Sequence, residues 1–193
     1  MLVQLGPGLR LTLILTVLTG LLYPGVTTAL CQWLFPFQAN GSMVSANGRT
    51  VGSALIGQSF TRPEYFHPRP SGAGEKGYDA AASGSPNLGP TSGKLIERVK
   101  GSVADFRKEN PDFIGSVPAD IVTTSSSGLD PHISPAAAEA QVARVARARG
   151  VAPDTIRELV RSHTTGPDLG FLGEPRVNVL MLNLALDEQF GGK

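Results

Sequence analysis

The segment Leu11–Phe37 contains no charged residue and constrains the chain more than any other feature. At about 1.5 Å of rise per residue, a helix of about 20 residues crosses a hydrocarbon core of roughly 30 Å. Trp33, Phe35 and Phe37 lie at its far end, where aromatic side chains are typical of a membrane interface. The segment predicts one transmembrane helix, preceded by a short head at residues 1–10.

A cleaved signal peptide is the alternative interpretation. Arg10 would be its charged start, Leu11–Leu22 its apolar region and Thr27–Ala29 a small-residue cleavage site. The apolar run continues past that site into the aromatic cluster, so a retained anchor is favoured. Charge alone fixes the orientation poorly, because Arg10 and Arg49 flank the segment on its two sides. The short head favours a cytoplasmic N-terminus and an extracytoplasmic domain at residues 38–193.

The charges of the chain lie almost entirely in that domain. Every Asp and Glu, and every Lys and Arg except Arg10, falls in residues 49–193, which are therefore neutral overall. Neutrality argues against nucleic acid or an anionic membrane surface as the partner. The one cysteine, Cys31, lies in the apolar segment, so the domain has no disulfide or thiol chemistry. About 155 residues suffice for one hydrophobic core.

Local patterns predict that this core belongs to an α+β domain. Asn47-Gly48 is a two-residue turn signal for a hairpin, and the apolar, β-branched residues that follow favour a strand at Val51–Phe60. Residues 62–91 are rich in Pro, Gly, Ser and Asn and predict a long loop. Apolar periodicity predicts helices at Ser92–Asn110, Ser134–Gly150 and Ala152–His163. Val179–Leu186 fits a strand or a helix, and its leucines favour the helix.

The helix at Ser134–Gly150 has the clearest end signals. Ser134 followed by proline is a strong start, and Gly150 is a left-handed stop. Three arginines near its C-terminus are interpreted as a complement to the helix dipole and as solubilising groups. They are Arg144, Arg147 and Arg149.

Ser125–Pro135 contains a serine run, Asp130 and His132, which invites a catalytic interpretation. Catalytic triads are assembled from distant parts of a chain, however, and no GxSxG elbow is present. Asp130 with His132 lacks further ligands for a metal site. A structural turn is favoured, with Gly128 at positive φ.

Six segments of the chain together carry a family resemblance. VGSALIGQSF, YFHPRPS, NLGPTS, SGLDPHISP, RVARARG and GEPRVNVLMLNLALD occur in this order after a single apolar segment. The chain resembles the C subunit of the Kdp-type potassium-transporting P-type ATPase, an inner-membrane complex. The resemblance covers nearly the whole length.

The resemblance implies an accessory subunit without catalytic residues, a metal or a tightly bound cofactor. Its partners would be a potassium-channel-like subunit and a P-type ATPase subunit, and it would be needed for their assembly and activity. The family is proposed to act as a catalytic chaperone that raises ATP affinity in a transient ternary complex, and Gln141 matches a nucleotide-related position. The chain has no Walker loop, so we expect indirect coupling. The alternative is an extracytoplasmic cap that gates or filters potassium at the entrance of the channel-like subunit.

The family motifs supply the candidate motif and interface residues. They are Arg69, Asn87, Gly128, Asp130, His132, Ser134, Glu174, Arg176 and Asn178. A separate candidate comes from the spacing in the apolar segment. Thr12, Thr16 and Gly20 recur every four residues, so they would form one small-residue face for packing against a membrane helix of a partner.

Overall fold

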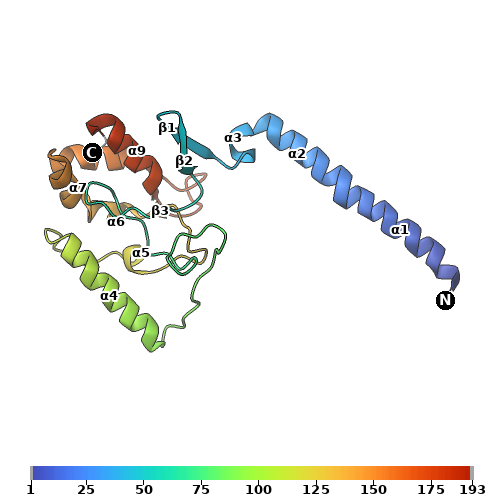
Figure 1. Ribbon diagram of the computed structural model, residues 1–193, viewed down its shortest axis with the longest axis horizontal. Helices are drawn as coiled ribbons and strands as arrows, with labels where there is room; N and C mark the ends of the chain where they lie inside the picture. Colours follow the sequence, from blue (N-terminus) through green and yellow to red (C-terminus); the bar gives the residue numbers. More distant parts are fainter. Residues whose placement is uncertain (1, 192–193) are drawn as a thin grey trace. The chain divides into compact units, whose positions relative to one another are not determined.

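The computed structural model describes residues 2–191 and divides the chain into two units, one ending at Ser53 and one beginning at Ala54. Figure 1 shows their elements. The first unit contains the helical segments η1 (Leu2–Gln4), α1 (Leu5–Val17), η2 (Leu18–Leu22), α2 (Tyr23–Leu34) and α3 (Pro36–Ala39) and the strands β1 (Met43–Ala46) and β2 (Arg49–Ser53). The second contains α4 (Gly93–Glu109), α5 (Ala119–Val122), β3 (His132–Ile133), α6 (Pro135–Glu139), α7 (Val142–Arg149), α8 (Pro153–Ser162), β4 (Thr164–Thr165), β5 (Arg176–Asn178) and α9 (Val179–Phe190).

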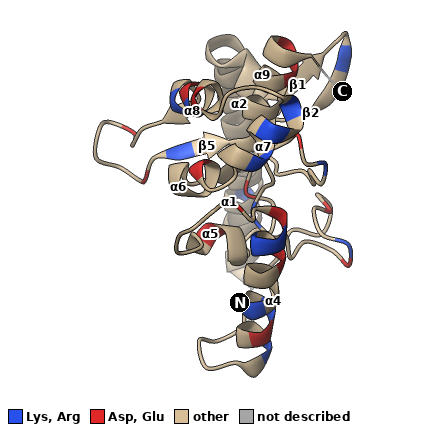
Figure 2. Ribbon diagram, turned by 90° about the vertical axis from the view of Figure 1, so that its left-hand side faces the viewer, with Lys and Arg blue, Asp and Glu red and all other residues tan. Residues whose placement is uncertain are grey.

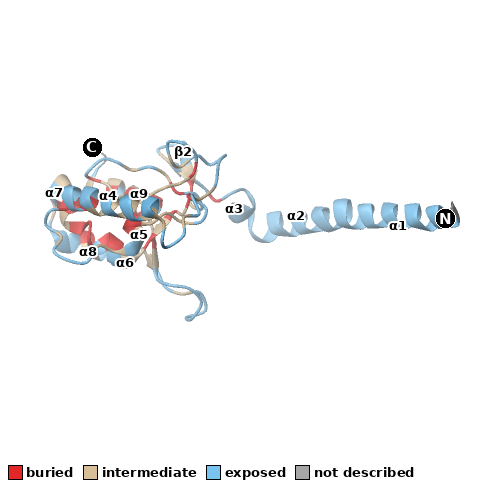
Figure 3. Ribbon diagram, turned by 90° about the horizontal axis from the view of Figure 1, so that it is seen from below, coloured by how far each residue is buried: buried red, intermediate tan, exposed pale blue. Residues whose placement is uncertain are grey.

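The first unit is dominated by a helical run, Leu5–Leu34, that is long and apolar enough to cross a membrane. Its residues are exposed throughout, as Figure 3 shows for α1 and α2. The run begins six residues before the predicted start at Leu11. It ends at Leu34 because Phe35, which precedes a proline, adopts a non-helical conformation.

The helical run contains one turn of π-helix, η2, directly before Pro24. A proline has no N–H, and its ring collides with the carbonyl four residues earlier in a regular α-helix. In the wider turn the N–H of Tyr23 reaches back to the carbonyl of Leu18, five residues away. The helix thereby continues through the proline.

The predicted hairpin is confirmed, and its second strand is shorter than predicted. β1 and β2 pair antiparallel across Asn47 and Gly48, both of which have positive φ. Past Ser53 the predicted strand at Val51–Phe60 is wrong. There Gly57 donates a single hydrogen bond of 2.7 Å to the carbonyl of Leu129, and an added Cβ would lie 2.7 Å from the carbonyl oxygen of Asp130. This close approach requires glycine, and residues 54–60 form no strand.

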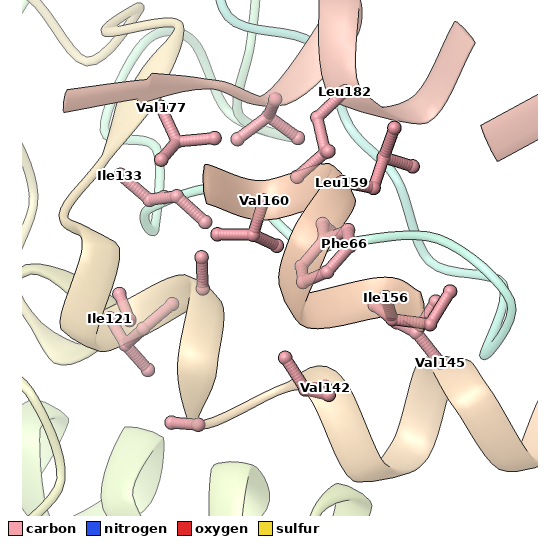
Figure 4. Close-up of a cluster of buried hydrophobic side chains, with 14 of the residues drawn as sticks. Phe66, Ile121, Ile133, Val142, Val145, Ile156, Leu159, Val160, Val177 and Leu182 are labelled. Carbon is pink, nitrogen blue, oxygen red and sulfur yellow. The ribbon is translucent and has the colours of Figure 1, made fainter. Parts of the chain in front are cut away.

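The second unit has an α+β core, as the sequence predicted. Its antiparallel sheet has the order β3-β5-β4, and α8 packs against α6, α7 and α9. Figure 4 shows side chains from these helices and strands meeting in one cluster. Its labelled members are Phe66, Ile121, Ile133, Val142, Val145, Ile156, Leu159, Val160, Val177 and Leu182.

Most helix predictions in this unit are confirmed, including the helix at α9 and its cap. Asn178 accepts a hydrogen bond of 3.1 Å from the N–H of Met181, and Ser134 caps α6 by accepting one of 3.0 Å from Ala137. Gly150 ends α7 with a φ of 73°.

One helix prediction is wrong, because Ser134–Gly150 forms two helices that are separated at Ala140 and Gln141. The side-chain amide of Gln141 donates to the carbonyl of Ala137, the group that its own backbone N–H would bind in a continuous helix. That N–H instead binds the carbonyl of Ala138, one residue closer, at 2.9 Å. The side chain of Gln141 thus competes with the backbone and tightens the helix.

Candidate functional site

The polar network of the second unit is centred on the backbone of residues 63–67, part of the long predicted loop. Four side chains hold this backbone, three from helices and one from the break between α6 and α7, and we call them the loop clamp. They are Gln141, Arg144, Arg149 and Asn183. Because the loop has no regular structure, its buried backbone groups depend on side-chain partners.

Two amide side chains of the loop clamp bind adjacent residues in the same way. Asn183 on α9 accepts from the N–H of Phe66 at 2.8 Å and donates to its carbonyl at 3.0 Å. Gln141 accepts from the N–H of His67 at 2.8 Å and donates to its carbonyl at 3.1 Å. The two amides therefore pair with the loop as a neighbouring strand would, and Phe66 is driven into the core.

Gln141, the nucleotide-related candidate, is saturated by its own chain. Its side-chain oxygen also accepts from Arg144 at 2.6 Å, and its nitrogen also donates to Ala137 at 3.2 Å. All four hydrogen bonds that an amide readily makes are formed, and Gln141 is 1% exposed. A ligand could bind this amide only by displacing one of these partners.

Arg144 binds two carbonyls of the loop and is 5% exposed. It donates to the carbonyls of Pro63 at 2.6 Å and Tyr65 at 2.9 Å, and to the side chain of Asn110 at 3.0 Å. Burial lowers the pKa of its guanidinium to about 10, against the opposing effect of Glu109 and Glu64. Arg144 is therefore still charged at neutral pH.

Arg149 joins the same loop to the C-terminal helix. It donates to the carbonyl of Glu64 at 2.9 Å and to the carboxylate of Asp187 at 2.8 Å, and it lies 5.2 Å from the ring centroid of Tyr65. Tyr65 in turn donates to Asp187 at 2.9 Å. The loop, α7 and α9 are thus joined through a single buried cation.

The interpretation of the three arginines as surface groups is wrong for two of them. Arg144 and Arg149 are buried in the loop clamp, whereas Arg147 is exposed and pairs with Asp112 at 2.5 Å. Arg144 and Arg149 reach carbonyls of the loop, whereas the side chain of Arg147 is 58% exposed. A guanidinium has five donors, which suits it to gathering several loop carbonyls.

The predicted turn is present between Ser125 and the start of β3 at His132, and it forms a second network with other residues of the same loop. Gly128 has a φ of +68°, and a Cβ there would lie 2.6 Å from the carbonyl oxygen of Gly84 and 2.7 Å from the nitrogen of Ala73. The hydroxyl of Ser71 donates to the carbonyl of Gly128 at 2.6 Å. The turn therefore fits between two segments of the loop where only glycine can lie.

Asp130 and Arg69 form an ion pair of 2.8 Å in this network. The other carboxylate oxygen of Asp130 accepts from the backbone N–H of His132 at 3.0 Å. Burial by itself would raise the pKa of Asp130, but the hydrogen bonds from His132 and Arg69 outweigh it and lower the pKa to about 2. Asp130 therefore remains ionised in the folded domain and holds the turn against the loop.

Two further motif residues join segments that are distant in the sequence. Ser134 donates to Asp120 through its N–H at 2.6 Å and through its hydroxyl at 3.1 Å. The amide of Asn178 donates to the carbonyl of Ala54 at 2.7 Å while it caps α9. These side chains position neighbouring segments of the domain.

Three other motif residues lie at the surface. Arg176 pairs with Asp168 at 3.2 Å, Asn87 is exposed with a φ of 49°, and Glu174 is exposed. The structure does not bring Glu174 or Asn87 into either polar network, as far as residues 2–191 are described. Some motif residues therefore make contacts inside the domain, and others are exposed on its surface.

On the candidate packing face of the helical run, Thr16 differs from the neighbouring threonines in its hydrogen bonding. The hydroxyls of Thr12 and Thr19 donate to carbonyls of their own helix, at 2.9 Å to Gly8 and 2.7 Å to Leu15. Thr16 makes no such bond within the described chain. Gly20 lies in the π turn and has no atom within 4 Å of an added Cβ outside the local helix.

Sequence reasoning missed several residues that hold the domain together. Asn183 and Tyr78 are examples, the latter with a hydroxyl that donates to the carbonyl of Arg69 and a pKa raised by burial to about 12. The sequence did contain a signal for Asn183, because it stands within the apolar run Val179–Leu186. A buried amide needs hydrogen-bond partners, so its position there predicts a polar contact in the core.

A cleft of about 810 Å³ lies beside the turn. Its lining includes Arg69, Asp130 and a row of hydroxyls from Ser83 and residues 124–127. In the described residues, no serine of this row is hydrogen-bonded to a histidine, and no group of three His, Cys, Asp or Glu side chains could hold a metal ion. The polar side chains around it hold the backbone of their own chain.

Comparison with known proteins gives the family. The family model for the K+-transporting ATPase, c chain, matches residues 5–188. A potassium-transporting ATPase KdpC subunit from Myxococcus xanthus is 61% identical over 95% of this chain and 87% of that protein. KdpC subunits from Gemmatimonas aurantiaca and Koribacter versatilis are each 56% identical, over 97% and 92% of this chain and 94% and 90% of their own lengths. The chain belongs to the KdpC family of potassium-transporting ATPase subunits.

The close approach at Gly128 predicts a large loss of stability on substitution. Gly128→Val should lower the free energy of unfolding by about 1–3 kcal/mol through backbone strain alone, and further through the clash with Gly84 and Ala73. Gly89→Val is the matched control, because Gly89 has open space around it and a φ that needs no glycine. Thermal unfolding of the full chain in detergent measures both variants. Equal unfolding midpoints for the two would contradict this account of the turn.

The ionised state of Asp130 predicts an acid-sensitive contribution to stability. Its pKa is lowered from 3.8 to about 2, so the contribution is present above pH 4 and is lost as the pH falls toward 2. The pKa difference corresponds to about 2 kcal/mol. Asp130→Asn should be less stable than wild type at pH 7, and this gap should close between pH 4 and pH 2. A gap that is the same at every pH would refute the prediction, with unfolding followed by circular dichroism.

Proposed function

We propose that this chain is a non-catalytic accessory subunit, needed for assembly and full activity of the potassium-transporting ATPase, which raises the ATPase subunit's affinity for ATP by coupling through the complex. The supporting observation is the saturated amide of Gln141, the nucleotide-related candidate. Because all four bonds are made to groups of its own chain, two of them to the loop, its effect on ATP affinity would be transmitted through the fold of the domain. Any ATP contact would arise only in a ternary complex with the ATPase subunit.

The proposed place of the domain follows from its anchor. The apolar helix Leu5–Leu34 would span the inner membrane once, with Arg10 near its cytoplasmic end and the domain outside. Cytoplasmic ATP does not reach that compartment, which again requires indirect coupling. The partners are a potassium-channel-like subunit and a P-type ATPase subunit of the same complex.

A packing face on the same helix would contribute one of the contacts between this chain and its partner subunits. The hydroxyl of Thr16 has no acceptor within the described chain, and in a bilayer an unsatisfied donor is costly. Gly20, four residues on, lets another helix approach closely. The pair therefore fits a site where a partner helix supplies a carbonyl or other acceptor.

An extracytoplasmic cap over the potassium entrance is the second candidate, and the open cleft favours it. The row of hydroxyls at residues 124–127 lines this cleft together with Asp130. Oxygen atoms are the ligands that channels use for potassium. A cap would change the potassium dependence of the complex rather than its ATP dependence.

Membrane orientation is tested by thiol labelling of intact cells. In a Cys31→Ser background, Ser116→Cys places a thiol on an exposed loop of the domain and Gln4→Cys places one before the apolar helix. We expect a membrane-impermeant maleimide to label residue 116 in intact cells and residue 4 only after lysis. The reverse pattern, or a mature chain that lacks residue 4, would overturn the proposed anchor.

Indirect coupling is tested by comparing the two amides of the loop clamp. Gln141→Leu and Asn183→Leu each leave buried backbone groups of the loop unsatisfied, which costs about 1–3 kcal/mol per group. Both should lower the thermal midpoint of the chain and raise the half-saturating ATP concentration of the assembled complex to a similar degree. If only Gln141→Leu weakens ATP dependence, the amide contacts nucleotide directly. If potassium dependence alone changes in both, the cap is the better function.

The packing face is tested by a substitution that preserves hydrophobicity. Thr16→Leu with Gly20→Ile should leave membrane insertion intact and lower detergent-stable co-purification with the partner subunits, because the helices can no longer approach. Leu13→Ile with Val17→Leu is the matched control on a neighbouring part of the helix. Undiminished co-purification of the first double variant would show that the helix is only a tether.

A further inference from the structure

The loop between β4 and β5 carries a concentration of exposed apolar side chains. Leu169 is 83% exposed and Phe171 is 74% exposed, and Leu172 beside them is also exposed. We call Asp168–Leu172 the apolar finger. Figure 2 shows the loop that leads into β5 projecting from the domain. Large apolar side chains that gather on a surface and are bordered by polar residues mark interaction sites.

The apolar finger is a defined turn with fixed ends. Asp168 and Leu172 form an isolated β-bridge, with N–H to carbonyl distances of 2.8 and 2.9 Å. Arg176 on β5 pairs with the carboxylate of Asp168 at 3.2 Å. The bridge and the ion pair thus hold the base of the loop against the sheet. The apolar side chains at its tip point into solvent.

The backbone of the tip is held in an uncommon conformation. Leu169 has a φ of 52°, a region that non-glycine residues rarely adopt. Such conformations persist where the surroundings impose them, and they cluster at binding sites. A preformed tip loses less conformational entropy on binding, which favours a shaped protein recess over a fluid lipid surface.

The charges around the apolar finger also favour a protein recess over a lipid surface as its binding partner. Arg176 is the only basic residue in positions 164–178, and Asp168 neutralises it. Glu174 is exposed, and no ion pair to it occurs in the described part of the chain. A segment of net negative charge with no free cation is repelled by an anionic bilayer. It is complemented by a protein surface that carries Lys or Arg beside an apolar recess.

We propose that the apolar finger inserts into an apolar recess on another subunit of the potassium-transporting complex, and that a basic residue beside that recess pairs with Glu174. This inference rests on the proposed function, because it assigns the contact through which the accessory domain engages its complex. Phe171 is the central anchor, since aromatic side chains dominate the binding energy of such contacts. The polar rim consists of Asp168, Glu174 and Arg176.

Photo-crosslinking identifies the occupant directly. Phe171→p-benzoylphenylalanine in the full chain, co-expressed with the other subunits, should yield an adduct with one of those subunits after irradiation of cell membranes. Ile114→p-benzoylphenylalanine is the matched control, because Ile114 is 98% exposed and lies outside the finger. Adducts with lipid alone from position 171, or equal subunit adducts from both positions, would overturn the proposal.

Substitution measures the strength of the contact. Leu169→Ser with Phe171→Ser should lower co-purification of the complex at least about tenfold, whereas Ile114→Ser should leave it unchanged. Glu174→Lys provides a second, charge-reversing variant that does not alter the tip, and it should also reduce recovery. Wild-type recovery in both finger variants would overturn the finger contact and leave the accessory function standing. A wild-type chain that neither co-purifies with nor stimulates the complex would overturn the accessory function itself.

Discussion

The domain depends on two side-chain amides that bind the backbone of one irregular loop. Residues 54–92 contain no helix or strand, yet Phe66 lies in the centre of the core. A buried backbone without regular structure must find its hydrogen-bond partners elsewhere. Asn183 and Gln141 provide them for Phe66 and His67, each through one accepted and one donated bond. Without these pairs the loop could not cross the core, and the surrounding helices would lose the side chain they pack around.

Two buried cations extend this arrangement, and one of them, Arg144, binds the side chain of Gln141 at the break between α6 and α7. Arg144 and Arg149 together bind carbonyls of Pro63, Glu64 and Tyr65, and Gln141 must turn inward to serve both Arg144 and the loop. Removing a partner from a buried charge is costly, so each member of the network depends on the others. The result is a domain whose polar groups are engaged internally.

The surface of the domain favours a partner that is recognised by shape and apolar contact rather than by charge. Basic and acidic residues are interspersed over the domain, as Figure 2 shows, and the overall charge of residues 49–193 is zero. Electrostatics therefore provides no general attraction, and specificity must come from shape and from apolar contact. The exposed helix Leu5–Leu34 and the apolar finger both offer such contact. We propose a bilayer and a neighbouring helix as the surroundings of the first, and a recess in a protein as the binding site of the second.

The sequence by itself determined the elements that depend on local rules. The apolar run, the Asn47-Gly48 hairpin, the caps at Ser134 and Asn178 and the positive φ of Gly128 follow from chain length, turn chemistry and steric limits within a few residues. The family also followed from the sequence, because its motifs are long. The tertiary structure alone decided the end of β2, the division of α6 from α7 and the burial of Arg144 and Arg149. These features depend on hydrogen bonds between residues tens of positions apart, such as Arg144 with Pro63, and no local pattern records which carbonyl a distant guanidinium will reach.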